Sequence, residues 1–305
     1  MDLTPILHRC PPTRLELLRK QPTLTLAKAL YELHPARAAP APSNPLTLVL
    51  ISDTHNHRPA LPDGDILIHA GDLTNTGTFA EIQTALDWLN AQSYKHIVLV
   101  AGNHDVLLDA RKDGTAPAHA HAHDAAEQRA ALAWGRVTYL CRSGATLVCG
   151  EREVTVWGSP HTPRHGNGAF QYTRTQDIWR DTVPEGLDVL VTHGPPQGHL
   201  DCDGFGCALL GQELWRLRHR PKVHVFGHCH AGRGVERAAF DALQGAWERV
   251  VAAKGSVWGL VRLLGAFFGG LVFGRREQVL FVNAALVQGL TLRDEVVREA
   301  MVVDI

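Results

Sequence analysis

The 305-residue chain carries 30 Lys and Arg residues against 31 Asp and Glu residues, which gives a formal net charge of −1. A chain of this length can bury a large core, and we expect one main domain. The charge balance supplies no overall field for nucleic acid or an anionic membrane, so either partner would require a local patch. Six irregularly placed cysteines and a start without an apolar leader predict a cytoplasmic protein with no disulfide framework.

Residues 1–45 are predicted to hold an N-terminal helix and a linker. Leucines in residues 1–34 recur at spacings typical of an amphipathic helix. Residues 35–45 are rich in Pro and Ala, which favours an extended, solvated linker. The main domain is therefore expected over residues 46–305.

Apolar runs in the main domain have the length and composition of buried strands. The runs that matter for function are residues 46–52, 66–70, 96–101, 189–192 and 223–226. Apolar residues at helical spacing follow the second run, with Thr76 or Thr78 as the N-cap. Shorter strands are expected at 137–140, 145–149, 154–157 and 279–283, and another helix at 207–219. Strands alternating with helices predict an α/β fold.

Two insertions are predicted, near residues 109–134 and 240–277. The first contains His119, His121 and His123 among alanines, a composition that favours a disordered, solvated segment. The second contains residues 255–274, which are apolar apart from Ser256 and Arg262. About 20 such residues can cross a bilayer, but glycines recur here and a core strand follows closely. We therefore expect a buried or interfacial hairpin, flanked by Lys254, Arg275 and Arg276.

Each of the five main strand predictions is followed directly by a motif that carries Asp, Asn or His. The motifs are Asp53-Thr54-His55, Gly71-Asp72, Gly102-Asn103-His104-Asp105, His193-Gly194 and Gly227-His228-Cys229-His230. In open α/β sheets, ligands gather at the carboxyl ends of the strands, so these motifs can converge in one place. The pattern predicts a site for two metal ions.

Two divalent cations held close together require a shared anionic ligand, and Asp72 is the candidate. Imidazoles mixed with carboxylates suit Mn, Fe, Zn or Ni better than Mg or Ca. Side chains two residues apart in an extended segment point the same way, so His228 and His230 can both face the site while Cys229 points away. His69 and His224 lie inside apolar runs and are interpreted as hydrogen-bonded core histidines.

In this order the motifs resemble the calcineurin-like metallophosphoesterase superfamily, over residues 46–283. The longer strings Ile51-Ser52-Asp53-Thr54-His55-Asn56 and His193-Gly194-Pro195-Pro196 resemble its branch of small metallophosphoesterase-domain proteins, which are related to class III cyclic-nucleotide phosphodiesterases. The resemblance implies a four-layer α/β/β/α sandwich with the dimetal site at the strand carboxyl ends.

The resemblance also implies a role for each motif residue. The first metal would be bound by Asp53, His55, Asp72 and His230, and the second by Asp72, the side-chain oxygen of Asn103, His193 and His228. The metals would polarise a phosphoryl group and lower the pKa of a bridging water, which attacks as hydroxide. His104 would be the catalytic acid or charge stabiliser, with Asp105 orienting its imidazole.

The sequence therefore favours a dimetal-dependent phosphoesterase, with cyclic nucleotides or other small diesters as substrates. Two alternatives stay open: a phosphomonoesterase acting on proteins or small molecules, and a weakly active scaffold that docks on membranes through residues 255–274. Candidate substrate contacts are Asn56, His161, Arg164 and His165. The balanced charge disfavours a nuclease. No feature of the sequence indicates an oligomeric state.

Overall fold

A computed structural model of the chain describes residues 14–33, 44–112, 122–202, 204–253, 255–270, 278–288 and 296–305. The chain divides into two compact units. The larger contains residues 40–236 and 280–305, and the smaller contains residues 1–39 and 237–279.

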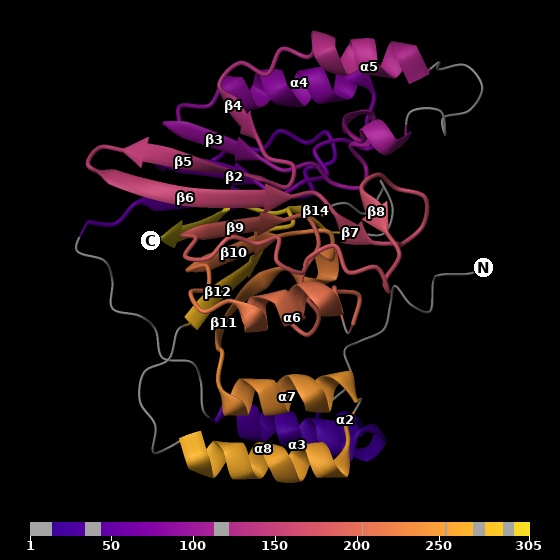
Figure 1. The fold of residues 1–305 in the computed structure, drawn as a ribbon, viewed down its shortest axis with the longest axis vertical. Coiled ribbons are helices and arrows are strands. Elements are labelled where there is room, and N and C mark those ends of the chain that lie inside the picture. The colour runs from indigo at the N-terminus through magenta and orange to yellow at the C-terminus, as the bar shows by residue number, and fades with distance from the viewer. Residues whose placement is uncertain are drawn as a thin grey trace. The chain divides into compact units, whose positions relative to one another are not determined.

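Two multi-stranded sheets form the body of the larger unit (Figure 1). The first has the order β15-β1-β2-β3-β4, with bounds Met301–Asp304, Thr47–Ile51, Ile66–His69, His96–Leu99 and Val137–Tyr139. The second has the order β11-β12-β10-β9-β6-β5, with bounds Gly234–Ala239, Gln278–Asn283, Val223–Phe226, Val189–Thr192, Arg152–Ser159 and Ser143–Cys149. Two short ladders join β7 (Thr162–Pro163) to β8 (Gln171–Tyr172) and β13 (Val287–Gln288) to β14 (Val296–Val297).

Both sheets have parallel centres. Strands β1 to β4 run parallel, while β15 is antiparallel to β1. In the second sheet β12, β10, β9 and β6 run parallel, and β5 is antiparallel to β6. Parallel strands bring their carboxyl ends to one edge of a sheet. Each sheet therefore presents the segments that follow its central strands at a common edge.

The side chains of β1 show how the layers are held together. Leu48 and Leu50 belong to the core between the sheets, which also contains Val189 and Val225 of the second sheet. The alternate residues of β1 point the other way and pack against helix α4 (Phe79–Asn90). Helices α4 and α5 (Ala122–Ala131) lie outside the first sheet, and α6 (Ala208–Arg216) lies outside the second (Figure 1). The predicted four-layer sandwich is confirmed.

Helix α4 begins where its capping residues predict. Thr78, one of the two N-cap candidates, accepts a hydrogen bond from the Glu81 amide, and the Glu81 carboxylate accepts one from the Thr78 amide. This reciprocal pair satisfies two amides that the first helical turn leaves unbonded. Helix α6 follows Cys207, whose Sγ accepts from the Leu210 amide.

The insertion near residues 109–134 differs from its prediction. Short 3₁₀ turns cover Val106–Leu108 and Ala110–Lys112, and α5 occupies Ala122–Ala131. The Arg129 guanidinium donates to the carbonyl of Leu107, and Leu132 just after the helix is buried. These contacts anchor the second half of the insertion, which is therefore helical and ordered. His119 and His121 lie outside the described residues.

The smaller unit contains α2 (Arg14–Lys20), α3 (Pro22–Glu32), α7 (Ala242–Ala252) and α8 (Val257–Gly270). The predicted N-terminal helix is thus two helices, separated at Gln21. Their core contains Ala27 of α3, Val250 of α7 and Leu263 of α8. The sequence assigned residues 240–277 to the main domain, whereas the structure groups them with the N-terminal helices, because the apolar faces of α3, α7 and α8 complete one another.

Parts of two further predictions fall outside the described residues. These are residues 34–43 of the predicted linker and residues 271–277 after α8. Across the described ranges, the structure contains no helix with the length and hydropathy that a bilayer crossing requires.

Candidate metal centre

The motif residues lie at the carboxyl ends of strands from both sheets. The first sheet supplies Asp53 and His55 after β1, Asp72 after β2 and Asn103 after β3. The second sheet supplies His193 after β9, and His228 and His230 after β10. The structure gathers the His and Asp members of this set into two groups that can each hold a metal ion.

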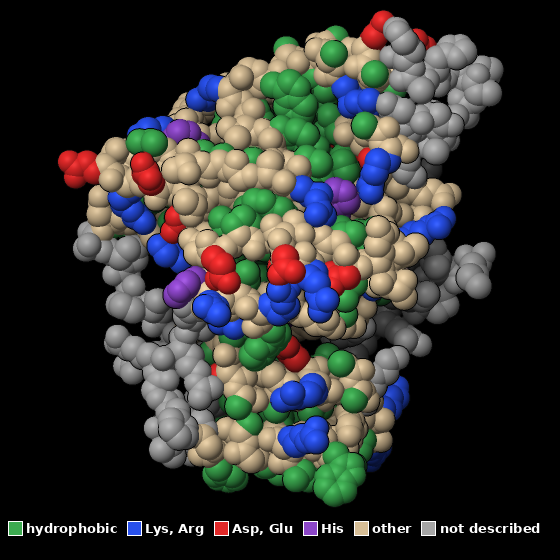
Figure 2. Space-filling model, viewed as in Figure 1, with side chains coloured by type: hydrophobic (Ala, Val, Ile, Leu, Met, Phe, Trp, Pro, Cys, Tyr) green, Lys and Arg blue, Asp and Glu red, His purple; other side chains and the backbone are tan. Residues whose placement is uncertain are grey.

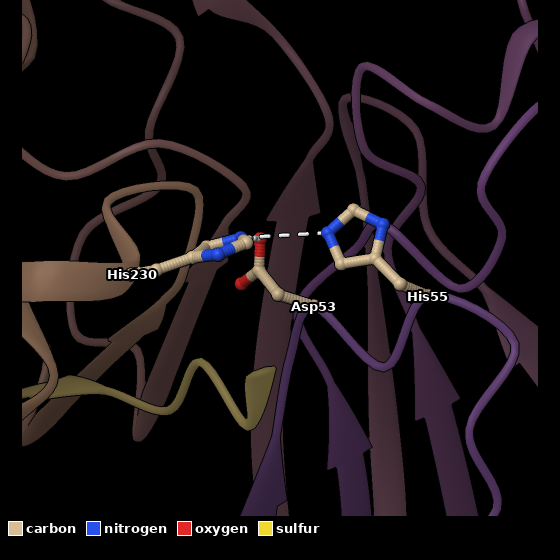
Figure 3. Close-up of side chains that lie close together, drawn as sticks. All are labelled: Asp53, His55 and His230. Atoms are coloured by element: carbon tan, nitrogen blue, oxygen red, sulfur yellow. Dashed lines mark hydrogen bonds and ion pairs between the residues drawn. The ribbon is translucent and has the colours of Figure 1, made fainter. Parts of the chain in front are cut away.

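The first group is Asp53, His55 and His230, whose ligand atoms lie within 4.8 Å of one another. His230 Nε2 lies 3.1 Å from Asp53 Oδ1 and 3.4 Å from His55 Nε2. Figure 3 shows the His230 ring and the Asp53 carboxylate meeting, with the His55 ring facing them. Two imidazole nitrogens and a carboxylate oxygen therefore converge on one point.

The second group is Asp72, His193 and His228, again within 4.8 Å. His193 Nε2 lies 3.3 Å from Asp72 Oδ2 and 3.0 Å from Asn103 Oδ1, so the asparagine oxygen joins this group. Asp72 Oδ2 also lies 4.0 Å from His55 Nε2 of the first group. The Asp72 carboxylate is thus placed between the groups, as a ligand shared by two cations must be.

The backbone fixes which nitrogen of His193 faces the site. His193 Nδ1 donates to the carbonyl of Ala70 at 2.9 Å, since a carbonyl can only accept. The lone pair of the neutral ring is therefore on Nε2, on the side of Asp72 and Asn103. A carbonyl that fixes the imidazole tautomer in this way is typical of metal-bound histidine.

The electrostatics of the site also fit a cation. Burial opposes the charge on Asp72, but His193 outweighs it and lowers the pKa of Asp72 to about 2. Burial likewise opposes a charged His193, yet Asp72 raises the pKa of His193 to about 9. Burial lowers the pKa of His228 to about 4, which keeps its ring neutral. Buried carboxylates need a positive partner, and oxygen and nitrogen donors in this mixture suit Mn, Fe, Zn or Ni.

The ligand loops adopt backbone conformations that most residues avoid. Positive φ angles occur at Asp53 (51°), His55 (43°), Asp72 (52°) and His228 (64°). Each such residue costs about 1–3 kcal/mol, a cost found mainly at functional sites. The motif glycines allow close approach: a Cβ on Gly102 would lie 2.2 Å from Asp72 Oδ1, and one on Gly227 would lie 2.0 Å from Asp53 Oδ2.

His104 lies beside the first group, and its ring is held by a residue that the sequence analysis missed. The ring meets that of His55 edge-on at a centroid distance of 4.9 Å. His104 Nδ1 donates to the carbonyl of Asn75 at 2.8 Å. This bond comes from a backbone carbonyl and not from Asp105, which was predicted to orient the ring. A backbone carbonyl leaves no signal in a sequence, although Asn75 follows the Gly71-Asp72 motif closely.

Asp105 instead ties two ligand loops together. Its buried carboxylate accepts from the Gly102 amide at 2.7 Å and from Thr74 Oγ1 at 2.8 Å. Gly102 precedes Asn103, and Thr74 follows Asp72. Adjacent residues in a turn point in different directions, so Asp105 supports the backbone while His104 faces the site.

The four candidate substrate contacts have different surroundings. Asn56 Nδ2 donates to Glu81 Oε1 at 2.7 Å, which holds the loop after β1. His161 is half-buried, and its Nδ1 lies 3.1 Å from Ser159 Oγ. Arg164 is exposed. The His165 ring lies 6.4 Å from that of His228 and 5.5 Å from that of Phe205, so it borders the second group.

The histidines interpreted as core residues are buried and hydrogen-bonded. His69 Nε2 lies 2.9 Å from Thr54 Oγ1, and His224 Nε2 lies 2.8 Å from Thr192 Oγ1. Burial lowers the pKa of each to about 3, so both rings are neutral. Cys229, between two ligand candidates, is buried as predicted.

Comparison with known proteins adds a family to this geometry. The model of the calcineurin-like phosphoesterase family matches residues 46–232. Probable rhamnogalacturonate lyase C of Emericella nidulans is 43% identical over 268 residues, which cover 86% of this chain and 24% of that protein. Metallophosphoesterase domain-containing protein 1 of Homo sapiens is 33% identical over 215 residues, covering 65% of this chain and 64% of the human protein. A UPF0046 protein of Caenorhabditis elegans is 35% identical over 197 residues, covering 62% and 65%.

The chain thus spans about a quarter of the length of the first relative and just under two thirds of the other two. The family match contains each of the seven candidate metal ligands, from Asp53 to His230.

Proposed function

Because this chain belongs to the calcineurin-like phosphoesterase family, we propose that it is a dimetal-dependent hydrolase of phosphate esters that acts on small diesters such as cyclic nucleotides. The observation that carries the proposal is the position of Asp72. Its Oδ2 lies 3.3 Å from His193 Nε2 and 4.0 Å from His55 Nε2, one nitrogen from each group. Two divalent cations at such a site polarise the phosphoryl group and lower the pKa of a water molecule.

Each part of the site has a defined task. Asp53, His55 and His230 would hold the first cation, Asp72 would be shared, and Asn103, His193 and His228 would hold the second. The ligands come from both sheets, so their spacing is set by the sandwich core. Ligands positioned by rigid elements keep the reacting groups in a fixed geometry, which is itself a large part of catalysis.

His104 is proposed as the catalytic residue that assists the leaving group. Its Nδ1–H is held by the Asn75 carbonyl, so Nε2 is the atom at which the ring can gain or lose a proton. The protonated ring can donate from Nε2 to the departing ester oxygen or stabilise its negative charge. The ring lies 4.9 Å from that of His55, next to the first cation site.

The charge around the site supports a diester substrate. A phosphate monoester carries a charge of about −1.5 to −2 at neutral pH, whereas a diester carries a single negative charge. Among the described residues, the imidazole rings of His104 and His165 border the candidate metal ligands. A singly charged phosphodiester is better matched to these neighbours than a doubly charged monoester.

A pair of rings supports a nucleotide as one of these diesters. Phe205 is 49% exposed, and its ring lies 5.5 Å from that of His165, which in turn borders His228. An exposed aromatic face this close to a phosphate site can stack on a base. We therefore assign the phosphodiester to the cations and the base to Phe205.

The test is a reconstitution. The chain is stripped of metal with a chelator, reloaded with Mn, and assayed with bis(p-nitrophenyl) phosphate, p-nitrophenyl phosphate and 3′,5′-cyclic AMP. We expect metal-stimulated hydrolysis with the two diesters preferred. Hydrolysis of the monoester alone would convert the assignment to a phosphomonoesterase. If added metal stimulates hydrolysis of none of the three, the proposal is wrong.

A further inference from the structure

Helix α8 of the smaller unit has two apolar faces. Leu260, Leu263 and Phe267 point inward and pack with the apolar side chains of α3 and α7. A surface helix normally packs one apolar stripe against the core and has polar residues on its remaining surface. A second, neighbouring face of α8 is apolar as well.

This second face, here called the α8 outer face, is exposed to solvent. It consists of Val257 (67% exposed), Trp258 (78%), Val261 (52%), Leu264 (39%) and Phe268 (65%). Four of these positions follow the spacing of one helical stripe, and Trp258 lies beside it. Figure 2 shows hydrophobic side chains along the lower edge of the helical unit, with Lys or Arg side chains near them.

The sequence around α8 is rich in basic residues. From Arg249 to Arg276 the sequence contains five basic residues and no Asp or Glu, and the basic residues are Arg249, Lys254, Arg262, Arg275 and Arg276. Arg262 belongs to α8 and is exposed. The whole chain has a net charge of only −1, so this local basic surface governs which partner approaches it.

An apolar stripe with an exposed Trp and Phe, on a helix that also carries the exposed Arg262, is the pattern of helices that lie in a membrane interface. Trp side chains settle at the headgroup level, where the indole body is buried and its N–H stays near water. The α8 helix has 14 residues, fewer than the roughly 20 needed to cross a bilayer. The helix is therefore too short to cross the bilayer but can lie in the plane of the membrane interface.

We propose that the α8 outer face docks on an anionic lipid bilayer, with Trp258 and Phe268 entering the boundary between headgroups and acyl chains. Arg262, which is exposed on α8, contacts the anionic headgroups and adds to the attraction. This docking site belongs to a different unit from the metal centre and does not depend on the proposed hydrolysis. It places the chain on a membrane surface through one short helix.

The test measures binding of the purified full chain to sedimented vesicles. Vesicles of phosphatidylcholine with phosphatidylserine are compared with vesicles of phosphatidylcholine alone. We expect binding to the anionic vesicles, which falls as salt is raised. Trp258→Ser and Phe268→Ser should each weaken binding roughly tenfold, because each removes a large apolar side chain that would enter the bilayer. Trp258→Tyr, which keeps an interfacial aromatic ring, should retain most of the binding.

Charge and apolar contact are separated with matched controls. Arg262→Gln should weaken binding to anionic vesicles by roughly fivefold, whereas Arg180→Gln, an exposed arginine of the larger unit, should have no effect. Val148→Ser, at an exposed valine of β5, should also have no effect. Circular dichroism establishes that each variant is folded.

Three results would overturn the inference. The wild-type chain could fail to bind either kind of vesicle, or Val148→Ser could weaken binding as much as Trp258→Ser does. Light scattering could instead show a dimer that Trp258→Ser dissociates, and a second copy would then be the occupant of the α8 outer face.

Discussion

The candidate metal ligands differ in structure from the proposed substrate rim, which consists of Arg164, His165 and Phe205. Asp53 and His193 are fully buried at strand ends, and backbone groups hold both side chains. Arg164, His165 and Phe205 lie on loops and are exposed. The candidate metal ligands are therefore part of the sheet edges, whereas the proposed substrate contacts are residues that can change without disturbing the core.

Removing the proposed shared ligand is expected to have the largest effect on hydrolysis. Asp72→Ala takes away the carboxylate between the two groups, so both cations lose a ligand and their mutual repulsion is no longer offset. We expect hydrolysis to fall roughly a thousandfold or more, with metal content measured by elemental analysis falling as well. Asp63→Ala, at an exposed aspartate, is the control. Full activity in Asp72→Ala would refute the bridging position.

A backbone change tests whether the geometry alone matters. Gly102→Ala adds a Cβ that would lie 2.2 Å from Asp72 Oδ1, so the carboxylate has to move. A displacement of about 1 Å can cost roughly a hundredfold in rate. Gly211→Ala is the matched control, because a Cβ there meets no atom within 4 Å. Equal rates for the two variants would show that the ligand edge tolerates movement.

Replacing His104 separates chemistry from metal binding. His104→Gln should slow turnover by roughly 10²- to 10⁴-fold, since it removes the proton donor while leaving the ligands in place. Elemental analysis should find the same metal content as in the wild type. Loss of metal equal to that in Asp72→Ala would make His104 a ligand instead.

The rim should show a smaller effect that depends on the substrate. Phe205→Leu removes the ring while keeping an apolar side chain, so we expect KM for 3′,5′-cyclic AMP to rise roughly tenfold. Glycerophosphocholine, a diester without a ring, should keep its KM. If both KM values rise together, Phe205 shapes the loop rather than binding a base.

The smallest effect is expected at Asn56, a candidate substrate contact that bonds to Glu81 in the structure. Asn56→Ala should lower the free energy of unfolding by about 1 kcal/mol or less, the value of one exposed hydrogen bond. Urea denaturation measures this change. KM should stay constant, and a clear rise would return Asn56 to the substrate rim.

The strand ends could be predicted because burial on both faces makes parallel strands continuous apolar runs. β1, β2, β3, β9 and β10 were all located in this way, and the polar motif after each run marked its carboxyl end. The charge argument called for a shared carboxylate with Asp72 as the candidate, and the family resemblance implied its place between the two groups. Chemistry that depends on side-chain type at a strand end is therefore readable from the sequence.

Chemistry that depends on a backbone group or on distant packing could not be predicted. The carbonyl of Asn75 holds the His104 ring, and no residue type announces it. The sequence showed that residues 255–274 were apolar but not that α3 and α7 would cover one face of α8. Phe205 was also not predicted as a substrate contact. Its proposed role rests on its ring lying beside His165, which in turn borders His228.

Because the candidate ligands come from two separate sheets, metal binding would also affect the stability of the folded chain. Asp53, Asp72 and Asn103 follow strands of one sheet, while His193 and His230 follow strands of the other. A cation bound between them would join the two sheets at this edge and would favour the native state over the unfolded chain, by about 2.7 kcal/mol at a concentration a hundred times its Kd. Removing the metal would thus make the chain easier for proteases to degrade and would also stop the proposed hydrolysis.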